Sequence, residues 1–137
     1  MLKVPCLHTG ILSTLSKCGH GDKILIADGN YPLHSNTNDN VERVYLNLTT
    51  GLPLVTDVLK VIDQMIAVEK LEVMVPEGGT RPEIFEEFNA IVSSVETLDE
   101  LGRYEFYEAC KAENVKLAIA TGEDRIYANV LLTVGVV

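Results

Sequence analysis

The 137-residue sequence has no tryptophan, only three cysteines, and 11 basic residues against 20 acidic ones. The formal charge of −9 argues against a nucleic-acid partner, because a protein without a basic face cannot exchange counterions with phosphates. The odd number of cysteines at scattered positions, Cys6, Cys18 and Cys110, argues against a disulfide framework and favours reduced thiols in the cytoplasm. We therefore expect a cytoplasmic protein whose ligand is neutral.

Long apolar runs are missing as well. No segment approaches the roughly 20 apolar residues that span a bilayer, and the start, Met1 to Pro5, lacks the apolar core of a signal peptide. This pattern predicts no membrane partner.

Apolar residues are nevertheless abundant. They make up 47% of the chain, and the mean hydropathy of +0.16 is high for a protein whose length suits one domain, residues 1–137. The final residues, from Leu131 to Val137, stay apolar to the end, where a monomer usually frays into polar sequence. We expect subunit contacts to cover the excess, and so predict a homo-oligomer.

Helical and extended patterns alternate along the chain. Helical spacing of apolar residues predicts helices over 9–18, 53–66, 82–95 and 103–114. Compact or alternating apolar runs predict strands over 23–28, 41–46, 71–75, 115–120 and about 127–133. At least two of these strands are almost continuously apolar, which is typical of strands buried on both faces. The alternation predicts a single-domain α/β fold, a three-layer sandwich with a largely parallel central sheet.

The segment from Gly19 to Ser35 organises the chemistry. His20 lies between two glycines before a short apolar strand, and Asp28 follows that strand. A strand of five residues spans about 17 Å, so its two ends cannot serve one small ligand by themselves. The turn that holds His20 must fold back over the strand, or a neighbouring subunit must contribute.

Each of these residues has a plainer alternative. Histidine can give or take a proton near neutral pH, but Gly19 and Gly21 could merely build a tight turn in which His20 bonds backbone. Asp28 should lie at the rim of the sheet, where open α/β sheets bind ligands, or it could close an Asx-turn. Both alternatives stay open.

Polar side chains later in the chain complete the candidate set. Arg103 and Tyr107 begin a predicted helix, and the five donors of arginine suit polyol hydroxyls as well as anions. Tyr127 and Asn129 flank Ala128, so on the predicted strand both would point to one face.

Cofactor signatures are weak. Cys6-Leu7-His8 and Cys18-Gly19-His20 are two Cys-x-His pairs, but zinc sites usually space their ligands more widely. The glycines form no dinucleotide or phosphate-binding fingerprint. We expect no cofactor and no metal.

Taken together, six blocks resemble the ribose pyranase and fucose mutarotase family, and their order and approximate spacing agree along the whole chain. They are Gly19-His20-Gly21-Asp22 and Asp28, Pro32 with His34-Ser35, Arg103 to Glu108, Thr121-Gly122-Glu123, and Tyr127-Ala128-Asn129 with its apolar tail. The chain is more similar to the fucose mutarotases, because the ribose-type enzymes typically have histidine in place of Arg103 and a Lys-Ser pair near His34-Ser35.

The resemblance implies an isomerase for a free monosaccharide, L-fucose before D-ribose. It implies His20 as the proton donor and Asp28, Arg103 and the segment Tyr127, Ala128 and Asn129 as the sugar-binding residues. It also implies a ring-shaped, decameric assembly with sites near subunit boundaries.

The residues suit this chemistry. Mutarotation protonates the ring oxygen and deprotonates the anomeric hydroxyl, which one acid and one base can do without a metal or nucleotide. Asp28, Tyr127 or a held water could be the base. A D-ribose pyranase, a non-catalytic sugar-binding or transport-accessory protein, and a purely structural role for the histidines remain the alternatives.

Overall fold

Strand β1 (Lys23–Ala27) lies inside the sheet, and four of its five residues are buried. The computed structural model describes all 137 residues. Its other strands are β2 (Glu42–Tyr45), β3 (Val68–Met74), β4 (Asp99–Leu101), β5 (Val115–Ala120) and β6 (Val130–Val134). Its helices are α1 (Thr9–Leu15), α2 (Val55–Asp63), α3 (Ile84–Ile91) and α4 (Arg103–Lys111).

The six strands form one sheet in the order β2-β5-β1-β6-β3-β4. β6 is antiparallel to both of its neighbours, β1 and β3, and the other three pairings are parallel. The prediction of a largely parallel sheet is therefore confirmed.

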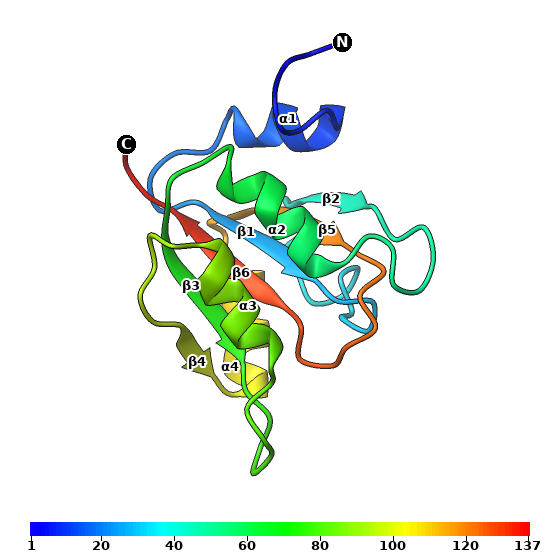
Figure 1. Cartoon of the computed structure of the whole chain (residues 1–137), viewed down its shortest axis with the longest axis vertical. Helices are drawn as coiled ribbons and strands as arrows, with labels where there is room; N and C mark the ends of the chain where they lie inside the picture. The colour runs from blue at the N-terminus through cyan, green and yellow to red at the C-terminus, as the bar shows by residue number, and fades with distance from the viewer.

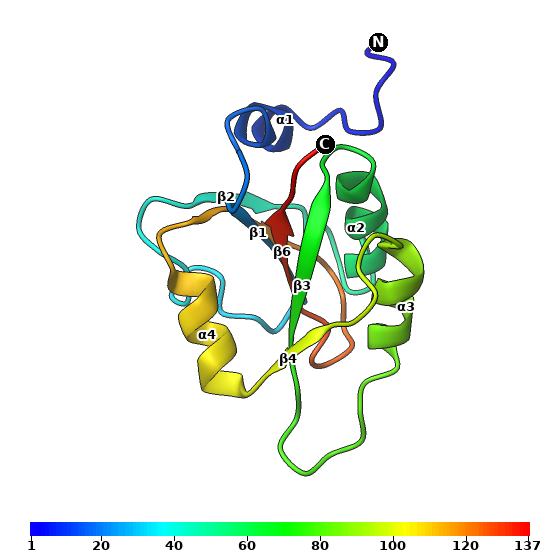
Figure 2. The ribbon, with the colours of Figure 1, turned by 90° about the vertical axis from the view of Figure 1, so that its left-hand side faces the viewer.

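Helices cover both faces of this sheet, which makes three layers (Figures 1 and 2). In Figure 2, α2 and α3 lie on one side of the strands and α4 on the other. An apolar cluster of 24 buried residues joins the sheet to α1, α2 and α3, and a second cluster of 12 joins it to α4. The α/β sandwich expected from the alternating patterns is confirmed.

The carboxyl-terminal apolar run is largely explained by β6. All five residues of this strand are buried, because it lies between β1 and β3 in the middle of the sheet. Only the last two residues, Val136 and Val137, are strongly exposed. The run thus contributes to the core of one chain, and it gives less support to subunit contacts than its composition suggested.

Three strands differ from the sequence-based predictions. β3 begins at Val68, three residues earlier than the predicted start at 71. β6 begins at Val130, three residues later than the pattern predicted, and Tyr127 lies in the loop before it. β4 was not predicted, because its three residues are polar or half-exposed and sit at the sheet edge.

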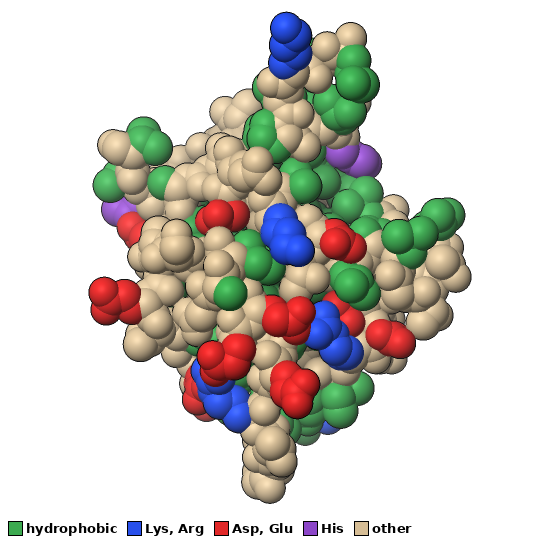
Figure 3. All heavy atoms as spheres, viewed as in Figure 1, with side chains coloured by type: hydrophobic (Ala, Val, Ile, Leu, Met, Phe, Trp, Pro, Cys, Tyr) green, Lys and Arg blue, Asp and Glu red, His purple; other side chains and the backbone are tan.

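The charge on the surface and the length of the helices bear on two kinds of partner, nucleic acid and membranes. Acidic and basic side chains are interspersed on the face shown in Figure 3, and no broad basic patch appears there. None of the helices combines the length and the apolar character that crossing a membrane requires.

Candidate functional site

A hollow of about 310 Å³, lined by polar and apolar side chains, lies beyond the carboxyl end of β1. This volume is at the lower end of the range of small-molecule sites, about 300–1,000 Å³. Residues from four separate parts of the chain line it: Asp28, Asn30, Tyr31, Met74, Arg103, Tyr107, Ile126, Tyr127 and Asn129. The structure therefore brings together the side chains of Asp28, Arg103, Tyr127 and Asn129, which were predicted to bind the sugar.

Asp28 is held at the rim by hydrogen bonds from both sides of the hollow. Its Oδ1 accepts from the backbone N–H of Asn30 at 2.9 Å, and its Oδ2 accepts from Ala128 N–H at 3.2 Å and from Asn129 Nδ2 at 3.1 Å. Its own N–H donates to Asn129 Oδ1 at 2.8 Å. A carboxylate offers about four acceptor positions, so Asp28 keeps capacity for a ligand hydroxyl.

Burial changes the proton affinity of Asp28. The residue is only 4% exposed. Its pKa lies above the usual range because loss of solvation outweighs the hydrogen bonds from Asn30, Ala128, Tyr31 and Asn129 that favour the ionised form. A carboxylate with a raised pKa is a better proton acceptor, which suits a general base.

Tyr127 has the one positive φ among the non-glycine residues, +58°. It occupies the left-handed region just before β6, where Ala128 N–H meets Asp28. The expectation that Tyr127 and Asn129 share one face of a strand is wrong, because both residues precede β6, which begins at Val130. Both side chains nevertheless line the same hollow.

Arg103 and Tyr107 lie on the first turns of α4, as expected. The Arg103 guanidinium is 5.7 Å from the centre of the Tyr107 ring, and both side chains line the hollow. Tyr107 in turn packs edge-on against Tyr31, with the ring centres 5.6 Å apart. This stacking holds an exposed cation at the mouth of the hollow.

Tyr31 is a functional candidate that the sequence reasoning missed. Its hydroxyl donates to the carbonyl of Asn36 at 2.9 Å, and burial raises its pKa far above the usual range. The phenol therefore stays neutral. Its position three residues after Asp28, in a Gly-Asn-Tyr loop, was the available signal.

His20 lies away from this hollow, in the turn before β1. Its Nε2 is 3.0 and 3.1 Å from the two carboxylate oxygens of Glu69, and its side chain is 59% exposed. β1 separates His20 from Asp28, and a strand of this length spans about 17 Å. The turn does not fold back over the rim, so one chain does not unite the predicted donor with the predicted sugar-binding residues.

Comparison with known proteins identifies the family. All of residues 1–137 match the model of the RbsD / FucU transport protein family. The chain belongs to this family. It is similar to the D-ribose pyranases of Clostridium perfringens, 32% identical over 139 residues, and Bacillus cytotoxicus, 33% identical over 137 residues, covering 100% of this chain and 99% of each relative.

Solved structures agree with this assignment. Bacillus subtilis RbsD complexed with D-ribose superposes with a TM-score of 0.84 at 31% identity. The fucose mutarotase from Streptococcus pneumoniae in complex with L-fucose gives a TM-score of 0.82 at 27% identity. Each comparison covers 100% of this chain and 99% of the other. The resemblance to the ribose pyranase and fucose mutarotase family is therefore confirmed.

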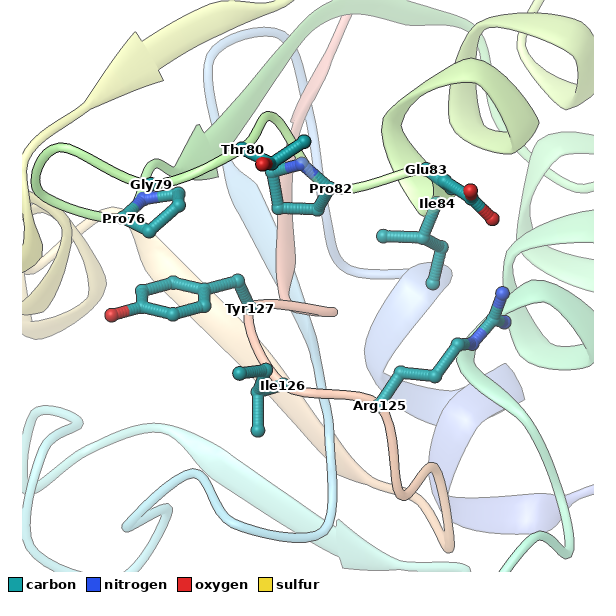
Figure 4. A pocket seen from close by; sticks show the side chains of 9 residues that line it. All are labelled: Pro76, Gly79, Thr80, Pro82, Glu83, Ile84, Arg125, Ile126 and Tyr127. Atoms are coloured by element: carbon teal, nitrogen blue, oxygen red, sulfur yellow. The ribbon is translucent and has the colours of Figure 1, made fainter.

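In this family member a second cavity adjoins the hollow. It measures about 520 Å³ and is formed by the loop after β3, the start of α3 and the segment from Arg125 to Tyr127. Figure 4 shows the Tyr127 ring on the side of Pro76 and Gly79, whereas Arg125 reaches toward Glu83. Ile126 and Tyr127 line both spaces, so the loop before β6 is the wall between them.

The histidines of the two Cys-x-His pairs have other partners. His8 caps α1, where its Nδ1 accepts from Ile11 N–H at 3.3 Å, and His20 contacts Glu69. The chain contains no group of three or more His, Cys, Asp or Glu side chains placed to hold a metal ion.

Proposed function

We propose that this family member is a mutarotase that interconverts the anomers of a free monosaccharide, with L-fucose as the first candidate and D-ribose as the second. The observation that carries the proposal is the buried Asp28 carboxylate in a small hollow also lined by Arg103, Tyr127 and Asn129. The names of the similar proteins support the reaction type and favour ribose, whereas arginine at position 103 favours fucose.

In the proposed reaction the anomeric hydroxyl gives its proton to Asp28 while His20 protonates the ring oxygen. The bond between the anomeric carbon and the ring oxygen breaks, leaving an aldehyde and a free hydroxyl. Rotation of the aldehyde and the reverse proton transfers close the ring on its other face. Positioned acids and bases contribute about 10²–10⁴-fold each to such transfers.

We further propose that His20 of one chain serves the hollow of another chain in a homo-oligomer, with a decamer as the expected size. The separation of His20 from Asp28 by the length of β1 supports this arrangement. Exposed apolar side chains beside the hollow, Tyr104 at 75% and Ile126 at 68%, offer surface that a second copy would bury. Free thiols at Cys6, Cys18 and Cys110 suit the cytoplasm, the compartment we propose.

Anomer exchange measured by NMR magnetisation transfer tests the activity. Purified protein should accelerate exchange of fucose most within a panel of fucose, ribose and galactose. His20→Ala should lose most of the acceleration, whereas the control His8→Asn keeps a side chain that can cap α1 and should stay active. Exchange at the buffer rate for all three sugars would refute the proposal.

Mixing two inactive variants tests the shared site. His20→Ala and Asp28→Asn chains, unfolded and refolded together, should form assemblies in which some hollows receive an intact His20 and an intact Asp28. Activity should reappear in the mixture and stay absent from either variant alone. Mixed assemblies that remain inactive would refute the shared site.

A non-catalytic sugar-binding role in transport is the second candidate, favoured by the description of the family as transport proteins. It predicts saturable monosaccharide binding without accelerated exchange, which the same sugar panel would reveal.

A further inference from the structure

The carboxylate of Glu69 is the partner of His20 within the chain. Both of its oxygens lie within 3.1 Å of Nε2, and all hydrogen bonds of the imidazole within the chain go through this nitrogen. The two residues are 49 positions apart in sequence. The contact therefore depends on the fold and not on the turn itself.

An irregularity in β3 places Glu69 there. The pairing of β3 with β6 shifts between Val68 and Lys70, so Glu69 is an extra residue in the ladder, as in a β-bulge. Such bulges re-aim a side chain and recur beside functional sites. Gly135 makes room for it, because a Cβ there would lie 3.1 Å from Glu69 Cβ and 3.5 Å from its Oε2.

The end of β6 also fixes the turn that presents His20. Gly21 N–H donates to the carbonyl of Val134 at 2.9 Å, and Val134 N–H donates to the carbonyl of Asp22 at 2.8 Å. The Asp22 carboxylate accepts from Gly19 N–H at 2.8 Å. The His20 turn and the segment that carries Glu69 are thus both anchored to the end of β6, although both side chains are solvent-exposed.

We propose that Glu69 is a positioning residue that keeps the His20 proton on Nε2 and so makes Nδ1 the atom that exchanges a proton with the sugar. This inference rests on the proposed function. The doubly protonated ring gives its Nδ1 proton to the ring oxygen and regains one when the sugar closes, while Nε2–H stays bonded to Glu69. The carboxylate accepts from Nε2–H and orients the ring, as carboxylates do in other His–carboxylate pairs.

The nitrogen-15 spectrum of His20 in the intact protein tests this directly, without sugar. Chemical shifts of the neutral ring report which nitrogen bears the proton. The Nε2–H form should dominate in the native protein and in Glu69→Asp, and both forms should be populated in Glu69→Gln, whose amide can donate as well as accept. Glu42→Gln, an exposed strand carboxylate on β2, is the matched control and should leave the ring unchanged.

Exchange kinetics provide the second measurement. Glu69→Gln should lower kcat on the order of tenfold with little change in KM, the lower end of the roughly 10–100-fold cost that removal of a carboxylate partner has at metal-bound histidines. Glu69→Asp should restore part of the rate. An unchanged tautomer in Glu69→Gln would overturn the inference even if the native protein is active. If the native protein leaves exchange at the buffer rate, the proposed function fails, and the spectrum alone decides whether Glu69 sets the tautomer.

Discussion

Asp28 and Asn129 are joined by two hydrogen bonds that run in opposite directions. The backbone N–H of Asp28 donates to the Asn129 amide oxygen, and the amide nitrogen donates to the Asp28 carboxylate. Because the amide uses both of its polar atoms, its orientation is fixed, and the end of β1 is tied to the start of β6. The rim of the hollow is therefore built before any ligand arrives.

Replacing Asn129 with aspartate should damage this rim. Asn129→Asp removes the donor and places a second buried carboxylate beside Asp28. We expect a loss of about 1–3 kcal/mol in the free energy of unfolding, the cost of leaving a buried polar group without its partner, together with loss of exchange activity. Denaturant unfolding measures the first and NMR the second. Asn36→Asp is the control, because the contact of Asn36 with Tyr31 uses the backbone carbonyl of Asn36, which the substitution keeps.

Asp28 should leave a signature in the pH dependence of stability. Its pKa is raised in the folded protein by burial, so the folded state binds the proton more tightly than the unfolded chain does. The contribution of Asp28 to stability is fully present below about pH 3.9, the ordinary value for aspartate, and is lost as the pH rises through the raised pKa. Thermal unfolding measured from about pH 3.9 upward should show stability falling with rising pH in the native protein, and Asp28→Asn should lack this fall. An identical profile in both proteins would contradict it.

Arg103 should influence the choice of sugar. Its guanidinium lies at the mouth of the hollow against Tyr107, where it can donate to several hydroxyls. Arg103→His should lower the acceleration of fucose exchange relative to ribose exchange by about tenfold, equivalent to one lost hydrogen bond of about 1.4 kcal/mol. Arg81→His, which changes an exposed arginine paired with Glu86 and Glu100, should leave the ratio unchanged.

Gly122 should tolerate no side chain. A Cβ at this position would overlap the carbonyl oxygen of Thr49 and would lie 2.6 Å from that of Leu52. Gly122→Ala must therefore push the 49–52 loop away and should lower the unfolding temperature by several degrees, as expected for a loss of about 1–3 kcal/mol. Gly19→Ala, where a Cβ meets nothing within 4 Å, is the control and should stay near the native value.

Local sequence predicted most of the fold because burial leaves a local pattern. β1 and β5 are almost continuously apolar and lie inside the sheet with both faces covered, as such runs indicate. β4 left no such pattern, since three residues at an edge need little apolar character. The start of β6 was placed too early because Tyr127 and Ala128 suit a strand in composition, although the backbone turns at Tyr127.

The site residues also fall into those that local sequence predicts and those that it does not. Asp28 was recognisable because it directly follows an apolar strand, and Arg103 because it begins a helix. Glu69 was not, since its contact with His20 joins residues 49 positions apart and depends on a shift in strand pairing. Contacts of this kind arise from the register of β3 against β6, which no short stretch of sequence specifies.

β6 joins the two ends of this chemistry. Ala128 and Asn129, directly before its first residue, hold Asp28, and its last residue, Val134, holds the His20 turn. A strand in the middle of a sheet cannot stretch, so in the proposed shared site a single chain keeps its proton donor and its sugar rim permanently apart. The activity per chain should therefore depend on protein concentration. It should fall on dilution, as contacts between copies dissociate, and recover by mass action when the protein is concentrated again.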